Sequence, residues 1–225
     1  RKTLRRAVVD KFNEIKKWNC QDFEELKEQI DYRKREVRTE ANSIINELKI
    51  CDPAVGSGHF LVSALNELIA IKSELGILQD AGTEPKRIVD YDIIIEDDEL
   101  VMANEDGERF CYDPSNTSSQ RIQQTIFEEK RTIIENCLFG VDLNPKSVEI
   151  CQLRLWIELL KNAYYYRNEF GERVLQTLPN IDINIKCDED YLKILNSAKA
   201  KLTTSIENIG FSVNIKFSKK EEDVS

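Results

Sequence analysis

A glycine-rich turn is the segment of this chain with the clearest chemical potential. Residues 52–60 read DPAVGSGHF and follow a short apolar run. Glycine tolerates positive φ and lets a ligand lie directly against the backbone, so Gly56 and Gly58 suit close approach. An amphipathic segment begins near His59, and the free N–H groups of a helix start favour an anionic group. Asp52, at the end of the apolar run, could accept a hydrogen bond from an ammonium or hydroxyl group. The segment predicts a ligand-binding loop between a strand and a helix.

The residues around these glycines decide which kind of ligand the loop suits. A P-loop needs Lys and then Ser or Thr after its last glycine, whereas His59 and Phe60 follow Gly58 here. A dinucleotide fingerprint needs a third glycine three positions later, and position 61 is Leu. A cofactor without phosphates remains. An ordinary strand-to-helix turn stays open as the alternative, because short glycine patterns give many false positives.

A second segment, residues 134–160, has the same strand-to-helix character. Its apolar run Cys137 to Val141 is long enough for a buried parallel strand and ends in Asp142. Asn144 suits an N-cap and Pro145 suits the first helical position. A carboxylate at the end of a strand can accept hydrogen bonds from both hydroxyls of a ribose. Asp142 is therefore a candidate ribose ligand, with a plain loop residue as the alternative.

Together the two segments resemble a known family. The string D-P-A-x-G-S-G-x-F resembles motif I of the amino-group DNA methyltransferases, which bind S-adenosylmethionine, and residues 134–160 look like their second cofactor motif. The resemblance covers roughly residues 44–187. It implies an α/β, Rossmann-like class I methyltransferase fold, present in part, with S-adenosyl-L-methionine as cofactor. The residues that it places at the cofactor are Asp52, Pro53, Ala54, Gly56, Ser57, Gly58, Phe60, Asp142 and Leu143.

The catalytic motif of that family is missing from the chain. The motif is Asn, Asp or Ser, then Pro-Pro and an aromatic residue, and all five prolines here are isolated. The aromatic-Thr-Pro step that usually precedes the glycine loop is missing as well. An exocyclic amine must be flipped out, stacked and hydrogen-bonded before it attacks a methyl group. We therefore assign no catalytic residue, and expect a part of a longer polypeptide that is inactive alone and binds the cofactor weakly. The resemblance implies that the parent is a DNA adenine-N6 methyltransferase of the type IIG restriction-modification kind. Whether an endonuclease is fused to it stays open.

The two acidic residues, Asp52 and Asp142, lie 90 positions apart, whereas about 20 is usual in a βαβ nucleotide-binding unit. An insertion, placed at residues 76–130, accounts for the difference. Within it, residues 88–112 alternate apolar and polar positions around DD and NEDG, which predicts a β-hairpin or small meander. The acidic content of this hairpin argues against contact with DNA phosphates and favours a structural or interdomain role. A polar stretch and a helix at 121–136 then lead to the second strand.

The flanking segments complete the predicted organisation. Residues 1–47 carry apolar positions at helical spacing and predict two or three helices before the core at 48–187. A third strand is expected at Ile181 to Cys187, and the acidic residues after it give no firm cofactor contact. Residues 188–225 predict a helix, a strand and a disordered tail.

Composition restricts the function classes. A net charge of −9 has the wrong sign for a stand-alone DNA grip, so DNA recognition is expected from regions outside this chain. With one histidine and no C-x-x-C pair, a zinc or other metal site is not expected, and the six cysteines are interpreted as reduced core thiols. No apolar run reaches membrane-spanning length and no signal peptide opens the chain, which favours a cytoplasmic protein without membrane contact.

Two other functions stay open. One alternative hypothesis, motivated by the acidic hairpin, is a non-catalytic scaffold or interaction module with a vestigial cofactor pocket. A small-molecule or protein methyltransferase would share the cofactor fold, although not the D-P-A-x-G-S-G-x-F spelling.

Overall fold

In a computed structural model, residues 2–80, 87–88, 90–176, 181 and 183–187 are described, and all statements below concern them. They belong to one of two units of the chain, Arg1–Cys187. The predicted helix, strand and tail of residues 188–225 lie outside the described residues. No described helix is both long enough and apolar enough to cross a membrane.

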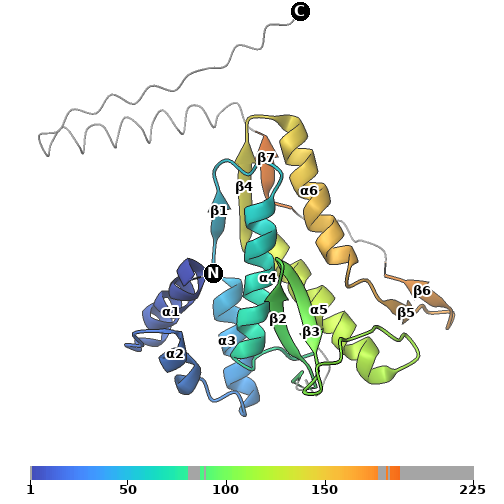
Figure 1. Cartoon of the computed structure of the whole chain (residues 1–225), viewed down its shortest axis with the longest axis horizontal. Coiled ribbons are helices and arrows are strands. Elements are labelled where there is room, and N and C mark those ends of the chain that lie inside the picture. Colours follow the sequence, from blue (N-terminus) through green and yellow to red (C-terminus); the bar gives the residue numbers. More distant parts are fainter. Residues whose placement is uncertain (1, 81–86, 89, 177–180, 182, 188–225) are drawn as a thin grey trace, which may run out of the picture. The chain divides into compact units, whose positions relative to one another are not determined.

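A three-stranded parallel sheet carries the two segments singled out in the sequence (Figure 1). Its order is β1 (Ile50–Asp52), β4 (Leu138–Asp142) and β7 (Ile185–Cys187), and both pairings are parallel. The expected strands before Asp52 and Asp142 are thus confirmed. The third strand is shorter than the predicted 181–187, because the chain turns just before it and the Ile185 N–H donates to the Ile183 carbonyl at 2.9 Å.

Helices pack on one face of this sheet. Helix α4 (His59–Glu74) contacts β1, and α6 (Pro145–Leu160) contacts β4, β7 and α4. On the covered face Leu138 is fully buried, and a Cβ at Gly140 would lie 2.9 Å from Val55 Cγ2. The strand alternation sends Cys51 to the other face, where it is exposed. The described helices therefore cover one side of the sheet and leave the other more open.

Three helices precede the sheet, as predicted. They are α1 (Lys2–Lys16), α2 (Phe23–Gln29) and α3 (Arg35–Asn46). Helix α2 begins after Asp22, whose carboxylate accepts from the Glu25 N–H at 3.0 Å, a typical N-cap. Their apolar faces are buried in the same core as α4, which contains Val8, Phe12, Leu26 and Ile45.

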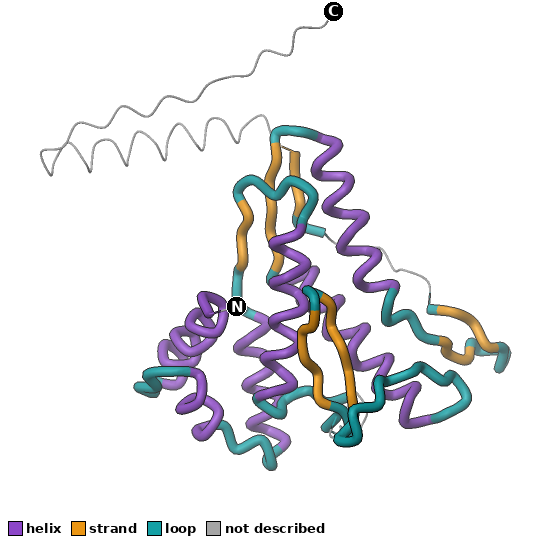
Figure 2. Tube along the Cα trace, in the orientation of Figure 1, coloured by secondary structure: helices purple, strands orange, loops and turns teal. Residues whose placement is uncertain are grey.

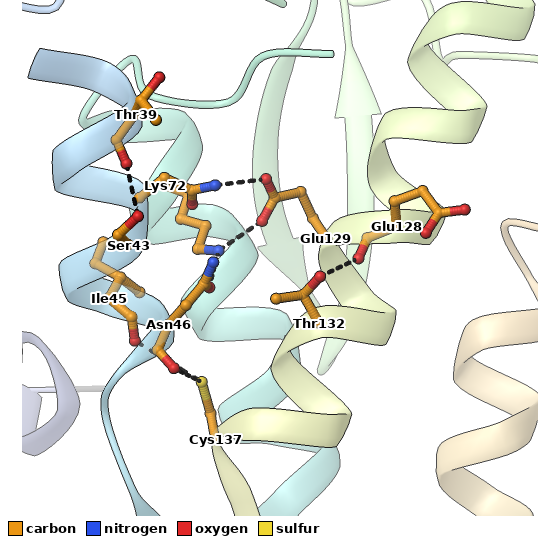
Figure 3. A network of polar contacts seen from close by, with 10 residues as sticks. Thr39, Ser43, Ile45, Asn46, Lys72, Glu128, Glu129, Thr132 and Cys137 are labelled. Atoms are coloured by element: carbon orange, nitrogen blue, oxygen red, sulfur yellow. Dashed lines mark hydrogen bonds and ion pairs between the residues drawn. The ribbon is translucent and has the colours of Figure 1, made fainter. Parts of the chain in front are cut away.

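A buried ion pair joins α3, α4 and α5 (Thr117–Asn136) (Figure 3). The Lys72 side chain is fully buried, and its Nζ donates to Asn46 Oδ1 and to Glu129 Oε2, both at 2.6 Å. The other Glu129 oxygen accepts from Asn42 Nδ2 at 2.8 Å. The buried charge of each partner is thus neutralised and hydrogen-bonded, which is the condition for such a pair to be tolerated.

The predicted hairpin within residues 88–112 is confirmed. Strands β2 (Asp92–Glu96) and β3 (Glu99–Ala103) pair antiparallel across a tight turn at Asp97 and Asp98, both with positive φ. The hairpin packs on α4, with Ile93 buried. Lys161, just after α6, forms a 3.1 Å ion pair with Glu99. The hairpin is therefore held against α4 and the end of α6.

Two local predictions were wrong or missing. Helix α5 begins at Thr117 rather than at 121, because Asn116 Oδ1 accepts from the N–H groups of Ser118 and Ser119 and makes this polar stretch a helix start. A second hairpin, β5 (Tyr165–Arg167) with β6 (Arg173–Leu175), was not predicted.

Candidate cofactor-binding site

The glycine loop leaves β1 at its carboxyl end and enters α4 directly; Figure 2 shows this loop between the strand and the helix. The Asp52 carboxylate accepts from the Ala54 N–H at 3.1 Å, and the Gly58 N–H donates to the Val55 carbonyl at 2.8 Å. Gly56 and Gly58 have φ of +51° and +81°. A positive φ is strained for residues with a Cβ, so the backbone conformation favours glycine at both positions.

Gly58 is required for a second reason, because α6 packs against it. A Cβ at this position would lie 2.6 Å from Cys151 Sγ, closer than real Cβ contacts come. Burial raises the pKa of the Cys151 thiol to about 11, so this cysteine stays a neutral packing group. The loop is thereby held between α4 and the second strand-to-helix unit.

The start of α4 is open to a ligand. Its N-cap, Gly58, supplies no side-chain acceptor, whereas Asn144 accepts from the Lys146 N–H at the start of α6. The first side chains of α4, His59 and Phe60, are exposed. Backbone N–H groups that no side chain caps, together with the positive end of the helix dipole, favour a carboxylate or another anion here.

Asp142 joins the two predicted segments. Its Oδ2 accepts from the Gly56 N–H at 2.9 Å across 86 positions of sequence, and its Oδ1 accepts from the Asn144 N–H at 2.8 Å. A carboxylate oxygen has two lone pairs, so each still has capacity for a hydroxyl donor. The neighbouring Leu143 is 53% exposed. The structure therefore brings Asp142 to the glycine loop, as the motif pairing predicts.

The remaining predicted residues of the loop are accessible to solvent to different degrees. Pro53 and Ala54 are exposed, while Asp52 and Ser57 are half-buried. Phe60 lines a cavity of about 480 Å³ whose walls come from α1, β1, α4 and the β2–β3 hairpin.

The cysteines depart from the prediction of core thiols. Cys20, Cys137 and Cys151 are buried, but Cys51, Cys111 and Cys187 are exposed. Cys51 is exposed because it points to the open face of the sheet. In the described ranges, no group of three His, Cys, Asp or Glu residues could hold a metal ion.

Comparison with known proteins decides the family. Residues 26–204 match a family model described as MmeI, DNA-methyltransferase domain. The chain belongs to this family. Membership confirms the resemblance to DNA methyltransferases and implies a Rossmann-like methyltransferase fold for the α/β architecture described above.

The chain is also similar to a longer protein. The chain is 32% identical over 211 residues to the "Putative type II restriction enzyme and methyltransferase RM.MjaORFECS2P" of Methanocaldococcus jannaschii. The aligned part is 90% of this chain, which spans 14% of the length of the relative. No solved structure matches the chain.

Proposed function

We propose that this MmeI-type domain is the S-adenosylmethionine-binding part of a site-specific DNA adenine-N6 methyltransferase, within a type IIG restriction-modification enzyme whose nuclease lies elsewhere in the polypeptide. One observation carries the proposal. The 2.9 Å hydrogen bond from the Gly56 N–H to Asp142 joins the carboxyl ends of two neighbouring parallel strands. Ligands of open α/β sheets bind at that edge.

The residues present fit this cofactor. Asp142 has lone pairs free for ribose hydroxyls, and the uncapped start of α4 suits the carboxylate of the methionine end. Asp52 supplies an acceptor for its ammonium group. The bound cofactor would supply an electrophilic methyl group; the chain itself binds and orients it.

The amino-acid sequence supports the further proposal that other parts of the polypeptide handle the base. The amine of an adenine must be extruded from the duplex and hydrogen-bonded before it reacts. All five prolines of the chain are isolated, so none belongs to the family's Pro-Pro loop. With a net charge of −9, the chain also offers no overall positive field for DNA phosphates. DNA binding and base positioning are therefore assigned to other parts of the polypeptide.

Calorimetric titration with S-adenosylmethionine and with its analogue sinefungin tests the proposal. Asp142→Asn keeps the side chain's size and one acceptor but removes the charge, so affinity should fall by roughly 10-fold to 150-fold, equivalent to about 1.5–3 kcal/mol. Asp142→Ala should weaken binding further. Asp106→Asn, an exposed carboxylate between β3 and α5, is the matched control and should bind as the wild type does.

A flat titration of the wild type, together with unchanged amide spectra for residues 52–60, would contradict the proposal. Methylation is tested separately. The 225-residue chain should transfer no methyl group to DNA, and the longer polypeptide should produce N6-methyladenine. Detection of N4-methylcytosine instead would reassign the base.

A further inference from the structure

A cavity of about 290 Å³ lies between the β2–β3 hairpin, α5 and the end of α6, and we call it the hairpin cavity. It is separate from the glycine loop, because α6 begins beside Asp142 and a helix of 16 residues is about 24 Å long. In Figure 1, α6 runs from the end of the sheet that carries the glycine loop toward the β5–β6 hairpin. Small-molecule sites begin at about 300 Å³. The hairpin cavity therefore suits a small molecule rather than a peptide.

Two buried amide side chains line the hairpin cavity and have hydrogen-bonding capacity left over. Asn162 is 7% exposed, and its side-chain amide has no hydrogen-bond partner in the described ranges. Gln123 is also buried; its Nε2 donates to the Ala163 carbonyl at 3.0 Å, and no described group donates to its Oε1. The fully enclosed side-chain atoms without a partner, among the residues described, are Asn42 Oδ1 and Asn66 Oδ1. The free atoms of the other two amides therefore reach open space, and the space that they share is the hairpin cavity.

A buried lysine supplies a donor to the same cavity. Lys130 is 1% exposed; its Nζ donates to the Glu158 carbonyl at 3.0 Å and lies 3.7 Å from the Glu158 carboxylate. An ammonium group has three N–H donors, so at least one remains for a ligand. Burial lowers the pKa of Lys130 to about 8, and the ammonium form predominates below that pH. The hairpin cavity thus offers both donors and acceptors at neutral pH.

The charged side chains of the cavity wall already have partners. The Glu158 carboxylate is shared by the two lysines of the wall, and Lys161 also lies 3.1 Å from Glu99. Arg109, which is exposed, pairs with Glu96 at 3.0 Å. An ionic ligand would bring a charge into the cavity without a free counter-charge, at a desolvation cost that an uncharged ligand avoids. The charge balance therefore favours an uncharged ligand.

Apolar side chains from β3 and the segment after it complete the wall. Leu100, Met102 and Phe110 line the hairpin cavity and pack against the core of the domain. Small-molecule sites combine such an apolar lining with a few polar groups that fix the orientation of the ligand. The ligand should therefore have an apolar body and a polar edge.

We propose that the hairpin cavity binds a small uncharged molecule that carries an amide group on an apolar ring. The amide carbonyl accepts from Asn162 Nδ2 and Lys130 Nζ, and the amide N–H groups donate to Asn162 Oδ1 and Gln123 Oε1. An amide fits because it presents an acceptor beside a donor, as the side chain of Asn162 does. The inference does not rest on the proposed function, because the two sites lie at opposite ends of α6.

Titration of the 225-residue chain with benzamide, followed by the NMR signals of the side-chain amides, tests the proposal. The signals of Asn162 and Gln123 should shift and saturate. Benzoate and benzylamine have the same ring but carry a charge at neutral pH, so each should bind about 10-fold or more weakly than benzamide. Uracil, a cyclic amide, is titrated as well, and the tighter of the two amides shows whether the natural ligand has an open or a cyclic amide. The absence of saturable shifts with both amides, or tighter binding of either ion, would overturn the proposal.

The variant Asn162→Leu separates binding from stability. The amide of Asn162 has no partner to lose in the free chain, so the variant should unfold at the wild-type temperature or above, yet bind benzamide about 10-fold or more weakly. Asn136→Leu, at an exposed asparagine of α5, is the matched control and should bind as the wild type does. Unchanged affinity of Asn162→Leu would overturn the proposal.

A cavity-filling variant tests where the ligand binds. Leu100→Trp should abolish the binding of benzamide, whereas Ile94→Trp, on the neighbouring strand β2 and outside the hairpin cavity, should leave it unchanged. If Leu100→Trp does not fold, Met102→Phe fills the cavity less severely. Retained affinity in a folded cavity-filling variant would overturn the proposal. Titration of the same variants with S-adenosylmethionine reports on the glycine-loop site independently, so the two proposals can fail separately.

Discussion

Replacing the buried Lys72 by methionine should be among the most costly single changes in this domain. Lys72 Nζ is fully buried and makes two 2.6 Å contacts, to Glu129 and to Asn46. Methionine fills a similar volume without charge, but it leaves the Glu129 carboxylate buried without its cation. Removing one partner of a buried pair costs roughly 3–5 kcal/mol, so Lys72→Met should lower the free energy of unfolding by that amount.

The chain contains a matched control for burial. Lys16 Nζ contacts Glu40 at the same 2.6 Å distance, but the two side chains are 27% and 53% exposed. An exposed ion pair contributes about 0–1 kcal/mol, so Lys16→Met should change stability little. Because the two ion pairs have the same N–O distance, a difference in stability between the two variants reports the effect of burial.

Urea unfolding followed by circular dichroism measures both variants. The double variant Lys72→Met/Glu129→Leu removes both charges and should recover most of the loss, because buried pairs are often replaced by apolar residues at little cost. The reasoning is refuted if Lys72→Met costs no more stability than Lys16→Met. It is also refuted if the double variant loses as much stability as the single variants Lys72→Met and Glu129→Leu lose in sum.

Three further predictions follow from the structure. In thermal unfolding, Gly58→Ala should destabilise the domain more than Gly107→Ala. Both glycines have φ near +80°, so both variants share a backbone cost of about 1–2 kcal/mol, but only at Gly58 does the added Cβ meet another atom, Cys151 Sγ at 2.6 Å. Burial lowers the pKa of Lys130 to about 8 from 10.5, so between these pH values the unfolded chain holds a proton that the folded chain has lost and stability rises with pH. Lys130→Met should lack this rise, so the free energy of unfolding of the wild type minus that of the variant should grow with pH by at most about 1.4 kcal/mol per pH unit. The raised pKa of Cys151 lowers stability above pH 9, but it does so in both proteins. A thiol reagent should modify Cys51, Cys111 and Cys187 in the native chain and reach Cys20, Cys137 and Cys151 only on unfolding; rapid reaction of all six would contradict the described burial.

Local signals in the sequence were sufficient to place the two segments of the candidate site. Asp52 and Asp142 each end an apolar run, and Asn144 with Pro145 marks the start of a helix, so both strand-to-helix units could be placed without any tertiary information. What the sequence could not show is how they meet. The bond from Gly56 to Asp142 depends on the packing of β1 against β4.

Two features were not predicted: the β5–β6 hairpin, whose turn repeats that of the first hairpin, and the buried ion pair, whose two side chains are distant in sequence. The NEDG turn at 104–107 helped to predict the first hairpin, and NEFG at 168–171 forms the same turn, with Gly171 N–H donating to the Asn168 carbonyl. Reading it would have found β5 and β6. Lys72 and Glu129 look like surface residues in sequence, because nothing local shows that two helices bury them against each other.

The pairing of β1 with β4 also has a consequence for the order of folding. Ile50 pairs with Leu138, so the sheet closes only after the intervening helices and the β2–β3 hairpin have been gathered between the two strands. Helices and hairpins form within microseconds from contacts close in sequence, whereas a pairing across such a span must first overcome the entropy of closing a long loop. The edge of the sheet that carries Asp52 and Asp142 should therefore be among the last parts of the domain to form.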